Sequence, residues 1–214
     1  MKEYHKIPTI WKRDPETTNR CLLSGFWATP ELDYLKDNQW IWTEKVDGTN
    51  IRVMYECDGE GGPATIRYGG RTDSAQIPAQ LITALDIVFR PNIGIMDQLF
   101  DGPVCLYGEG YGAKIQKGGG NYRKDQGFVL FDIQIGEWWL KRENVENIAH
   151  ALGLNVVPVV GQGTLSQMVD VVLRGFESTW GPFPAEGVVA RPKMELKDRA
   201  GHRIICKLKH KDFK

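Results

Sequence analysis

The sequence predicts an α+β fold built largely from antiparallel sheets. Apolar, strand-like runs outnumber the helical patterns, and they cluster on both sides of the helices. The 214 residues are enough for one substantial domain, and this length also allows two lobes. The chain carries no internal repeat, no low-complexity run and no convincing linker, so we expect residues 1–214 to form a single domain.

One stretch, residues 44–52, links the expected fold to an expected function. It joins two apolar runs, residues 40–42 and 51–55, which predicts a hairpin of strand, tight polar turn and returning strand. Asp47-Gly48 has turn chemistry, because glycine reaches positive φ without steric cost. Lys45 would project from the strand end into a cleft, where burial or nearby cations can lower the pKa of a lysine nucleophile. A solvated lysine beside a turn is the alternative.

The other elements follow from hydrophobic spacing and from glycine and proline breakers. A short helix is expected from Thr29-Pro30 through Leu35, and residues 58–63 are expected to form a loop. Further strands are predicted at residues 64–68, 103–109, 128–135, 156–160, 187–190 and 203–208. Helical spacing occurs at residues 81–89, at 145–152 before Gly153 and at 165–173 before Gly175.

Composition limits the compartment and the classes of partner. Lys and Arg number 27 and Asp and Glu number 27, so a nucleic acid would have to be held by a local basic patch and not by overall charge. No apolar run approaches the roughly 20 residues of a membrane span, and the N-terminus lacks the apolar core of a signal peptide. The four cysteines form no CxxC pair, which favours buried free thiols over disulfides or a zinc site. We expect a cytoplasmic protein without a membrane partner.

Five short motifs follow one another along the chain: Lys45-x-Asp47-Gly48, Glu109-Gly110-Tyr111-Gly112, Phe131-Asp132-Ile133, Glu186-Gly187-Val188-Val189 and Lys207-Leu208-Lys209. In this order they resemble the nucleotidyltransferase motifs of the lysyl-AMP ligases and mRNA-capping enzymes. The resemblance implies a nucleotidyltransferase (ATP-grasp-like) domain of antiparallel sheets flanked by helices. It also implies that Lys45 is the nucleophile, which attacks the α-phosphorus of a nucleoside triphosphate, expels pyrophosphate and then passes the nucleotide on.

Two lysines near the C-terminus are candidates for binding phosphate. Lys207 and Lys209 alternate on a predicted strand, so both should point to the same face. Two ammonium groups there could hold the α-phosphate and depress the pKa of Lys45. The alternative is a solvated basic terminus, because Lys211 and Lys214 continue the positive charge.

Glu186 is the candidate metal ligand. It opens the apolar strand predicted at residues 187–190. A carboxylate at a strand end suits Mg²⁺, with Mn²⁺ as a substitute, because this ion takes one or two carboxylates together with substrate phosphates and waters. The alternative is a salt bridge to Arg191.

The resemblance implies further contacts with the nucleotide. Glu109 would bond the ribose hydroxyls, and Phe131 would stack on the purine, with an ordinary core phenylalanine as the alternative. Arg71 resembles the arginine that contacts the nucleotide or the 5′-phosphate strand. Glu44 would select the base edge, with a surface charge as the alternative, and Val46 is also included among the nucleotide-binding residues.

The sixth position of the lysine motif separates the branches of these enzymes. DNA ligases and capping enzymes usually carry arginine there, whereas this chain has Asn50, whose short amide can donate to a phosphate oxygen or to metal-bound water. The pattern resembles the ATP-dependent RNA ligases, which implies ATP as the nucleotide and RNA ends or a nicked RNA-containing duplex as partner. A DNA ligase, a GTP-dependent capping-type guanylyltransferase and a non-catalytic nucleotide- or RNA-binding module are the alternatives.

Two further stretches bear on the nucleic-acid substrate. Residues 113–124 are basic, glycine-rich and contain an aromatic side chain, which suits a nucleic-acid backbone; a flexible surface loop is the alternative. Only five residues follow Lys209, whereas the enzymes that the chain resembles append an OB-fold or a helical domain there. We therefore expect a chain without such an appended domain, or a partner protein that supplies the missing contacts.

Overall fold

The computed structural model describes residues 2–18, 20–57 and 63–213. The chain divides into two compact units: unit 1 comprises Met1–His5 and Asp47–Val157, and unit 2 comprises Lys6–Val46 and Pro158–Lys214. The chain passes between the units at three points, and one of these points falls inside the lysine motif, between Val46 and Asp47. Most of the loop predicted at residues 58–63 lies outside the described residues.

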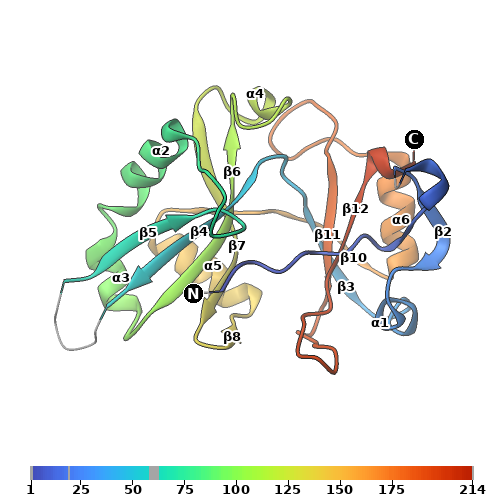
Figure 1. The fold of residues 1–214 in the computed structure, drawn as a ribbon, viewed down its shortest axis with the longest axis horizontal. Coiled ribbons are helices and arrows are strands. Elements are labelled where there is room, and N and C mark those ends of the chain that lie inside the picture. Colours follow the sequence, from blue (N-terminus) through green and yellow to red (C-terminus); the bar gives the residue numbers. More distant parts are fainter. Residues whose placement is uncertain (1, 19, 58–62, 214) are drawn as a thin grey trace. The chain divides into compact units, whose positions relative to one another are not determined.

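Unit 1 is built around a six-stranded sheet (Figure 1). Its strands are β4 (Thr49–Glu56), β5 (Thr65–Gly69), β6 (Val104–Gly112), β7 (Gln126–Ile135), β8 (Trp138–Trp139) and β9 (Asn155–Val156). The order is β5-β4-β6-β7-β8, all antiparallel, while β9 pairs with β7 in parallel. Both β6 and β7 are buried on both faces, which explains their nearly continuous apolar sequences.

Helices complete the core of unit 1. They are α2 (Ala79–Phe89), α3 (Ile93–Leu99), α4 (Gly119–Tyr122) and α5 (Arg142–Ala151). The buried side chains Leu81 and Leu85 of α2 and Val145 of α5 belong to the same apolar cluster as Leu106 and Leu130 of the sheet. The helical spacing at residues 81–89 and 145–152 therefore predicted both the helices and their buried faces.

Unit 2 contains a four-stranded antiparallel sheet in the order β10-β3-β11-β12. Its strands are β3 (Trp40–Glu44), β10 (Val159–Gly163), β11 (Gly187–Pro192) and β12 (Cys206–Lys209), and a separate pair consists of β1 (Trp11–Arg13) and β2 (Leu22–Trp27). The helical elements are η1 (Pro15–Thr17), α1 (Pro30–Tyr34), α6 (Leu165–Arg174) and η2 (His210–Phe213). Helix α6 begins with a capping box between Thr164 and Gln167, and Gly175 follows its last residue, as predicted.

Two sequence-based expectations about pairing are wrong. The strands on either side of Lys45 exist, but they form no hairpin: β3 pairs with β10 and β11, whereas β4 pairs with β5 and β6. The single strand expected at residues 156–160 is two strands, β9 and β10, which belong to different sheets. Apolar patterns reveal strands but do not reveal partners, so both errors have the same origin.

The expectation about Gly48 also needs correction, because its φ is not positive. A Cβ at this position would lie 2.3 Å from the carbonyl oxygen of Gly110 and 2.7 Å from Cγ of Glu109. Glycine is needed here for the close approach of β6 and not for a left-handed turn. The α+β class with antiparallel sheets and flanking helices is confirmed.

Candidate nucleotidyl-transfer site

Lys45 of unit 2 lies in an ion-paired cluster. It directly follows β3, and its backbone N–H donates to the carbonyl of Gly187 on β11 at 2.9 Å. Its Nζ lies 2.7 Å from Oε2 of Glu186, while Nζ of Lys209 lies 2.5 Å from Oε1 of the same carboxylate. The side chains of Lys45 and Lys209 are each 20% exposed, so the two ammonium groups are largely shielded from bulk water. The structure therefore brings together three of the residues predicted from the motifs.

Lys207 contributes a third ammonium group on the same face of β12. Its neighbours Cys206 and Leu208 are buried in the apolar core of unit 2, so the alternation predicted for Lys207 and Lys209 is confirmed. Burial lowers the pKa of Lys207 from its usual value, and the positive charges of Lys45, Lys209 and Arg13 lower it further. The surroundings of Lys207 thus include the cations of Lys45, Lys209 and Arg13 and the carboxylates of Glu186 and Asp212, and the excess of positive charge favours an anionic ligand.

Glu186 is held in its ionised form. Burial raises the pKa of this carboxyl, but the ammonium groups of Lys45 and Lys209 outweigh burial, and the pKa lies below its usual value. The salt bridge expected as the alternative, to Arg191, is replaced by these two ion pairs. No group of three or more His, Cys, Asp or Glu side chains that could hold a metal ion occurs within residues 2–18, 20–57 and 63–213. Protein ligands alone would therefore not form a complete metal site here.

Gly187 explains why Glu186 reaches both lysines. Gly187 pairs with Lys209 across β11 and β12, and a Cβ on Gly187 would lie 2.1 Å from the carbonyl oxygen of Leu208. Its φ of +154° is also unfavourable for residues with side chains. Only glycine allows the two strands to approach at this point, so the Glu-Gly pair of the motif has a direct geometric basis.

Glu44 is buried and not a surface charge. Its carboxylate accepts from the Ser178 hydroxyl at 2.6 Å, and from the Thr179 backbone N–H and hydroxyl at 2.9 and 2.8 Å. These three hydrogen bonds fix the loop that leads towards Glu186. The predicted recognition of the base edge by Glu44 stays a prediction. The same holds for nucleotide binding by Val46, whose side chain is buried.

The predicted site residues of unit 1 lie on neighbouring strands. Asn50 on β4 is directly opposite Glu109 on β6. The Oδ1 atom of Asn50 is buried and has no hydrogen-bond partner among the described residues. A buried polar atom usually has a partner, so this amide is suited to a ligand. The ribose contact predicted for Glu109 stays a prediction.

Phe131 occupies an irregular position on β7. Tyr107 pairs with Asp132 and Gly108 pairs with Leu130, so Phe131 is the extra residue of a β-bulge. Its ring is outside both apolar core clusters, which argues against the alternative of an ordinary core phenylalanine. The ring of Tyr4 contacts it edge-on, with a centroid distance of 5.1 Å. Stacking on a purine stays a prediction.

Arg71 is exposed in the turn that follows β5. Arg52 holds this turn, because its buried guanidinium donates to the carbonyl of Gly70 at 2.8 Å and to Asp73 at 2.6 Å. Sequence reasoning did not single out Arg52, although an arginine inside an apolar strand was an available signal. The contact of Arg71 with a nucleotide or a 5′-phosphate stays a prediction.

Sequence reasoning also missed residues that support the lysine cluster. Arg13 lies close enough to Lys207 to lower its pKa and pairs with the buried Asp212 at 3.2 Å. Asp212 in turn accepts from the backbone N–H of Lys209 at 3.0 Å. Neither Arg13 nor Asp212 belongs to a recognisable motif, and they are far apart in the sequence, so only the folded chain reveals the contact.

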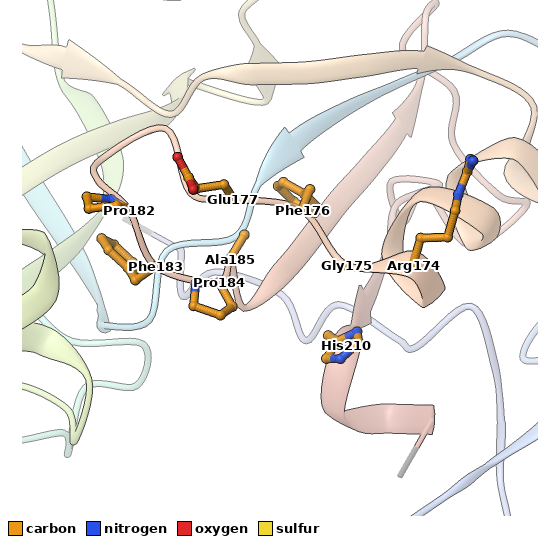
Figure 2. A pocket seen from close by; sticks show the side chains of 9 residues that line it. All are labelled: Arg174, Gly175, Phe176, Glu177, Pro182, Phe183, Pro184, Ala185 and His210. Atoms are coloured by element: carbon orange, nitrogen blue, oxygen red, sulfur yellow. The ribbon is translucent and has the colours of Figure 1, made fainter.

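A pocket of about 440 Å³ is present in unit 2 (Figure 2). Its lining includes Ala185 and His210, which are the sequence neighbours of Glu186 and Lys209. Nδ1 of His210 lies 3.0 Å from the carbonyl oxygen of Val172, so this nitrogen carries a proton and donates. None of the ten residues predicted for the site lines this pocket, and it is therefore distinct from the ion-paired cluster.

Comparison with known proteins identifies the family of the chain. The profile of the family described as RNA ligase matches residues 38–209, which contain all five motifs. A search of curated proteins gave no match. No helix within the described parts of the chain is long and apolar enough to cross a membrane.

Solved structures of the Naegleria gruberi RNA ligase resemble the chain. A variant with ATP and Mn has a TM-score of 0.62 and 22% identity, over 86% of this chain and 54% of the solved chain. An apo variant has a TM-score of 0.63 and 20% identity, over 99% and 58%. The protein with pyrophosphate has a TM-score of 0.62 and 20% identity, over 98% and 58%. The present chain thus spans a little over half of these proteins, and the likeness shows a shared fold. The match of the family profile over residues 38–209 shows that the chain belongs to the RNA ligase family.

Proposed function

We propose that the chain is the nucleotidyltransferase part of an ATP-dependent RNA ligase. In the first step, neutral Lys45 Nζ attacks the α-phosphorus of ATP, a P–N bond forms, and the bond to pyrophosphate breaks. In the second step, a 5′-phosphate oxygen of RNA attacks this phosphorus and Lys45 leaves. In the third step, a 3′-hydroxyl attacks the 5′-phosphorus, and AMP leaves as the phosphodiester forms. Each step exchanges one bond at phosphorus for another.

The observation that carries this proposal is the imbalance of charge around Lys45. Lys45 and Lys209 pair with Glu186, and Lys207 lies close enough to both lysines, to Arg13 and to Asp212 for their charges to change its pKa, so four cations accompany two carboxylates. A triphosphate would compensate the excess positive charge, and Lys207 and Lys209 would then stabilise charge on the α-phosphate during the transfer. A surface lysine beside a turn would need no such surroundings.

Glu186 has a double role in this proposal. Without a nucleotide it holds Lys45 as an ammonium ion, which is not nucleophilic. A bound triphosphate and divalent cation would compete for this ion pair, so Lys45 could lose its proton and Glu186 could turn to the metal. A single carboxylate fits Mg²⁺ or Mn²⁺ when phosphates and waters complete the coordination, and the metal would neutralise phosphate charge. The solved structures with ATP and Mn support the use of a divalent ion.

The proposal also assigns nucleotide contacts to residues of unit 1. Asn50 is the best supported, because its buried Oδ1 has no hydrogen-bond partner among the described residues. Glu109 is proposed to bond the ribose, Phe131 to stack on the purine and Arg71 to contact phosphate. We propose that residues 1–214 act as one domain, and that contacts from a partner protein assist strand joining.

The proposal is tested by incubating the protein with labelled ATP or labelled GTP and a divalent cation. We expect an acid-labile covalent adduct with ATP, none in excess chelator, and better joining of a nick with a ribonucleotide 3′-hydroxyl end than of an all-DNA nick. An adduct formed only with GTP would instead indicate a capping-type enzyme, and faster sealing of all-DNA nicks would indicate a DNA ligase. Absence of any adduct would indicate a non-catalytic binding module.

A further inference from the structure

The loop after β6, residues 113–124, carries positive charge that the site described above does not use. Lys114, Lys117 and Lys124 are exposed, and none of them forms an ion pair within the described part of the chain. Arg123 differs, because its guanidinium pairs with Asp125 at 2.6 and 2.8 Å and lies over the ring of Tyr111. Three ammonium groups therefore face solvent on one short segment.

The loop is fixed at both ends and is not a loose surface segment. The backbone N–H of Ala113 is within hydrogen-bond distance of the carbonyls of Arg123 and Asp125, at 3.1 Å each, and the carbonyl of Ala113 accepts from Gln126 Nε2 at 2.7 Å. Lys114 has a φ of +67°, a conformation that costs a non-glycine residue about 1–2 kcal/mol. These contacts present the lysines on a defined surface, so little ordering is required when a ligand binds.

Two hydrogen bonds connect this loop to the lysine motif within unit 1. The hydroxyl of Tyr122 accepts from the backbone N–H of Asp47 at 3.2 Å, and Gln116 Nε2 donates to the carbonyl of Gly48 at 3.1 Å. Asp47 and Gly48 are the second half of Lys45-x-Asp47-Gly48. The loop that carries the three lysines thus packs against Asp47 and Gly48, the second half of the motif.

The chemistry of the loop suits a polyanion that extends beyond one nucleotide. The whole chain has no net charge, so a local patch has to provide attraction for nucleic acid. Lysine ammonium groups contact phosphates as point charges and carry no base preference. We propose that Lys114, Lys117 and Lys124 bind the phosphodiester backbone of the RNA strand; this inference rests on the proposed function and names the surface that receives its substrate.

The test is a triple charge reversal, Lys114→Glu, Lys117→Glu and Lys124→Glu. The matched control reverses three exposed lysines elsewhere, Lys141→Glu, Lys193→Glu and Lys197→Glu. Fluorescence anisotropy measures binding of a labelled, 5′-phosphorylated single-stranded RNA at several salt concentrations. The logarithm of the binding constant falls linearly with the logarithm of the salt concentration, and each neutralised phosphate of a single strand contributes about 0.7 to the magnitude of this slope. The slope of the loop variant should therefore be smaller than that of the wild type by about 2. Its affinity for RNA should fall on the order of 100-fold, and the control should bind like the wild type.

Self-adenylylation without RNA separates this inference from the proposed function. Both triple variants should form the AMP adduct at the wild-type rate within about twofold, because the substituted residues are not assigned to the nucleotide site. A milder variant, with glutamine at the three loop positions, guards against misfolding and should show a smaller loss of RNA affinity. Equal RNA binding by the wild type and the loop variants would overturn the inference, as would an equal loss in the control. A wild type that binds RNA through the loop but forms no adduct would refute only the proposed function.

Discussion

The two units hold their predicted site residues in different chemical settings. In unit 2, the ammonium groups of Lys45 and Lys209 share the carboxylate of Glu186, and the charges of both lysines lower the pKa of Lys207. In unit 1, Asn50 has a buried amide oxygen without a hydrogen-bond partner among the described residues, and Phe131 is held at a bulge. The first arrangement is a coupled set of charges, whereas Asn50 and Phe131 of unit 1 are neutral groups. We therefore expect substitutions of Glu186 and Lys207 in unit 2 to change stability and activity together, and a substitution of Asn50 in unit 1 to change activity alone.

The largest expected effect is the loss of the nucleophile. Lys45→Ala should abolish the covalent adduct, because no other group of the cluster is assigned to attack phosphorus. The fold should persist, because Glu186 keeps its ion pair with Lys209. Labelling with radioactive ATP and circular dichroism measure both properties. An adduct of normal yield in this variant would remove Lys45 from the role of nucleophile.

The next largest effect is expected at the shared carboxylate. Glu186→Gln should reduce adenylylation by at least about 100-fold, because it removes the proposed metal ligand. It also leaves the ammonium groups of Lys45 and Lys209 without their shared carboxylate, so the free energy of unfolding should fall by about 1–3 kcal/mol. Chemical denaturation and adduct formation at saturating Mg²⁺ measure the two effects. Glu177→Gln, at an exposed position nearby, is the control. Full activity of Glu186→Gln would refute the metal role.

The same carboxylate predicts how stability changes with pH. The pKa of Glu186 in the folded protein lies below its usual value of 4.5. Its ion pairs therefore stabilise the fold fully above pH 4.5, and this stabilisation is lost as the pH falls through the lower, folded pKa. The difference in free energy of unfolding between wild type and Glu186→Gln should shrink at acidic pH. A difference that grows below pH 4.5 would contradict the ion pairs.

A smaller effect is expected in unit 1, where a substitution should lower the activity and leave the stability nearly unchanged. Asn50→Ala should slow adenylylation about tenfold to a thousandfold, the range for one well-placed hydrogen-bonding group in a shielded site. Its Tm should change little, because the buried Oδ1 atom has no hydrogen-bond partner among the described residues. Asn155→Ala, at an exposed position of the same unit, is the control for both measurements. Wild-type rates in Asn50→Ala would exclude Asn50 from the site.

The smallest loss of activity is expected for Lys207→Met, and this substitution should raise the stability of the fold. The pKa of Lys207 is lowered by burial and by neighbouring cations, so its charge opposes folding at neutral pH. Methionine removes this charge and keeps an unbranched apolar side chain. Adenylylation should fall by about tenfold, because one of two proposed phosphate ligands is lost. The Tm should rise by about 1–4 °C. A lower Tm would show that Lys207 stabilises the fold.

The sequence predicted the strands and the charged cluster well for a physical reason. Alternation on β12 requires Lys207 and Lys209 to share a face, and the Glu-Gly pair marks a close approach of strands. Helices α2, α5 and α6 followed from their apolar spacing and from Gly153 and Gly175.

Long-range partners could not be predicted in the same way. Turn chemistry at Asp47-Gly48 suggested a hairpin, but β3 and β4 pair in different sheets, and nothing local encodes that choice. Likewise, Ser178 and Thr179 hold Glu44 from 134 and 135 residues away. Helix α3 was missed because its seven residues bury only Met96, too few apolar positions to show a period.

The central claim is that Lys45 carries the nucleotide, and it can be tested directly by locating the adduct. Wild-type protein is incubated with ATP and Mg²⁺, digested under neutral conditions that preserve the P–N bond, and mapped by mass spectrometry. Our account predicts AMP on the peptide containing Lys45, and on no peptide from protein treated with chelator. An adduct on Lys207 or Lys209 would contradict the assignment of the nucleophile, and unmodified protein with both ATP and GTP would contradict the proposed reaction.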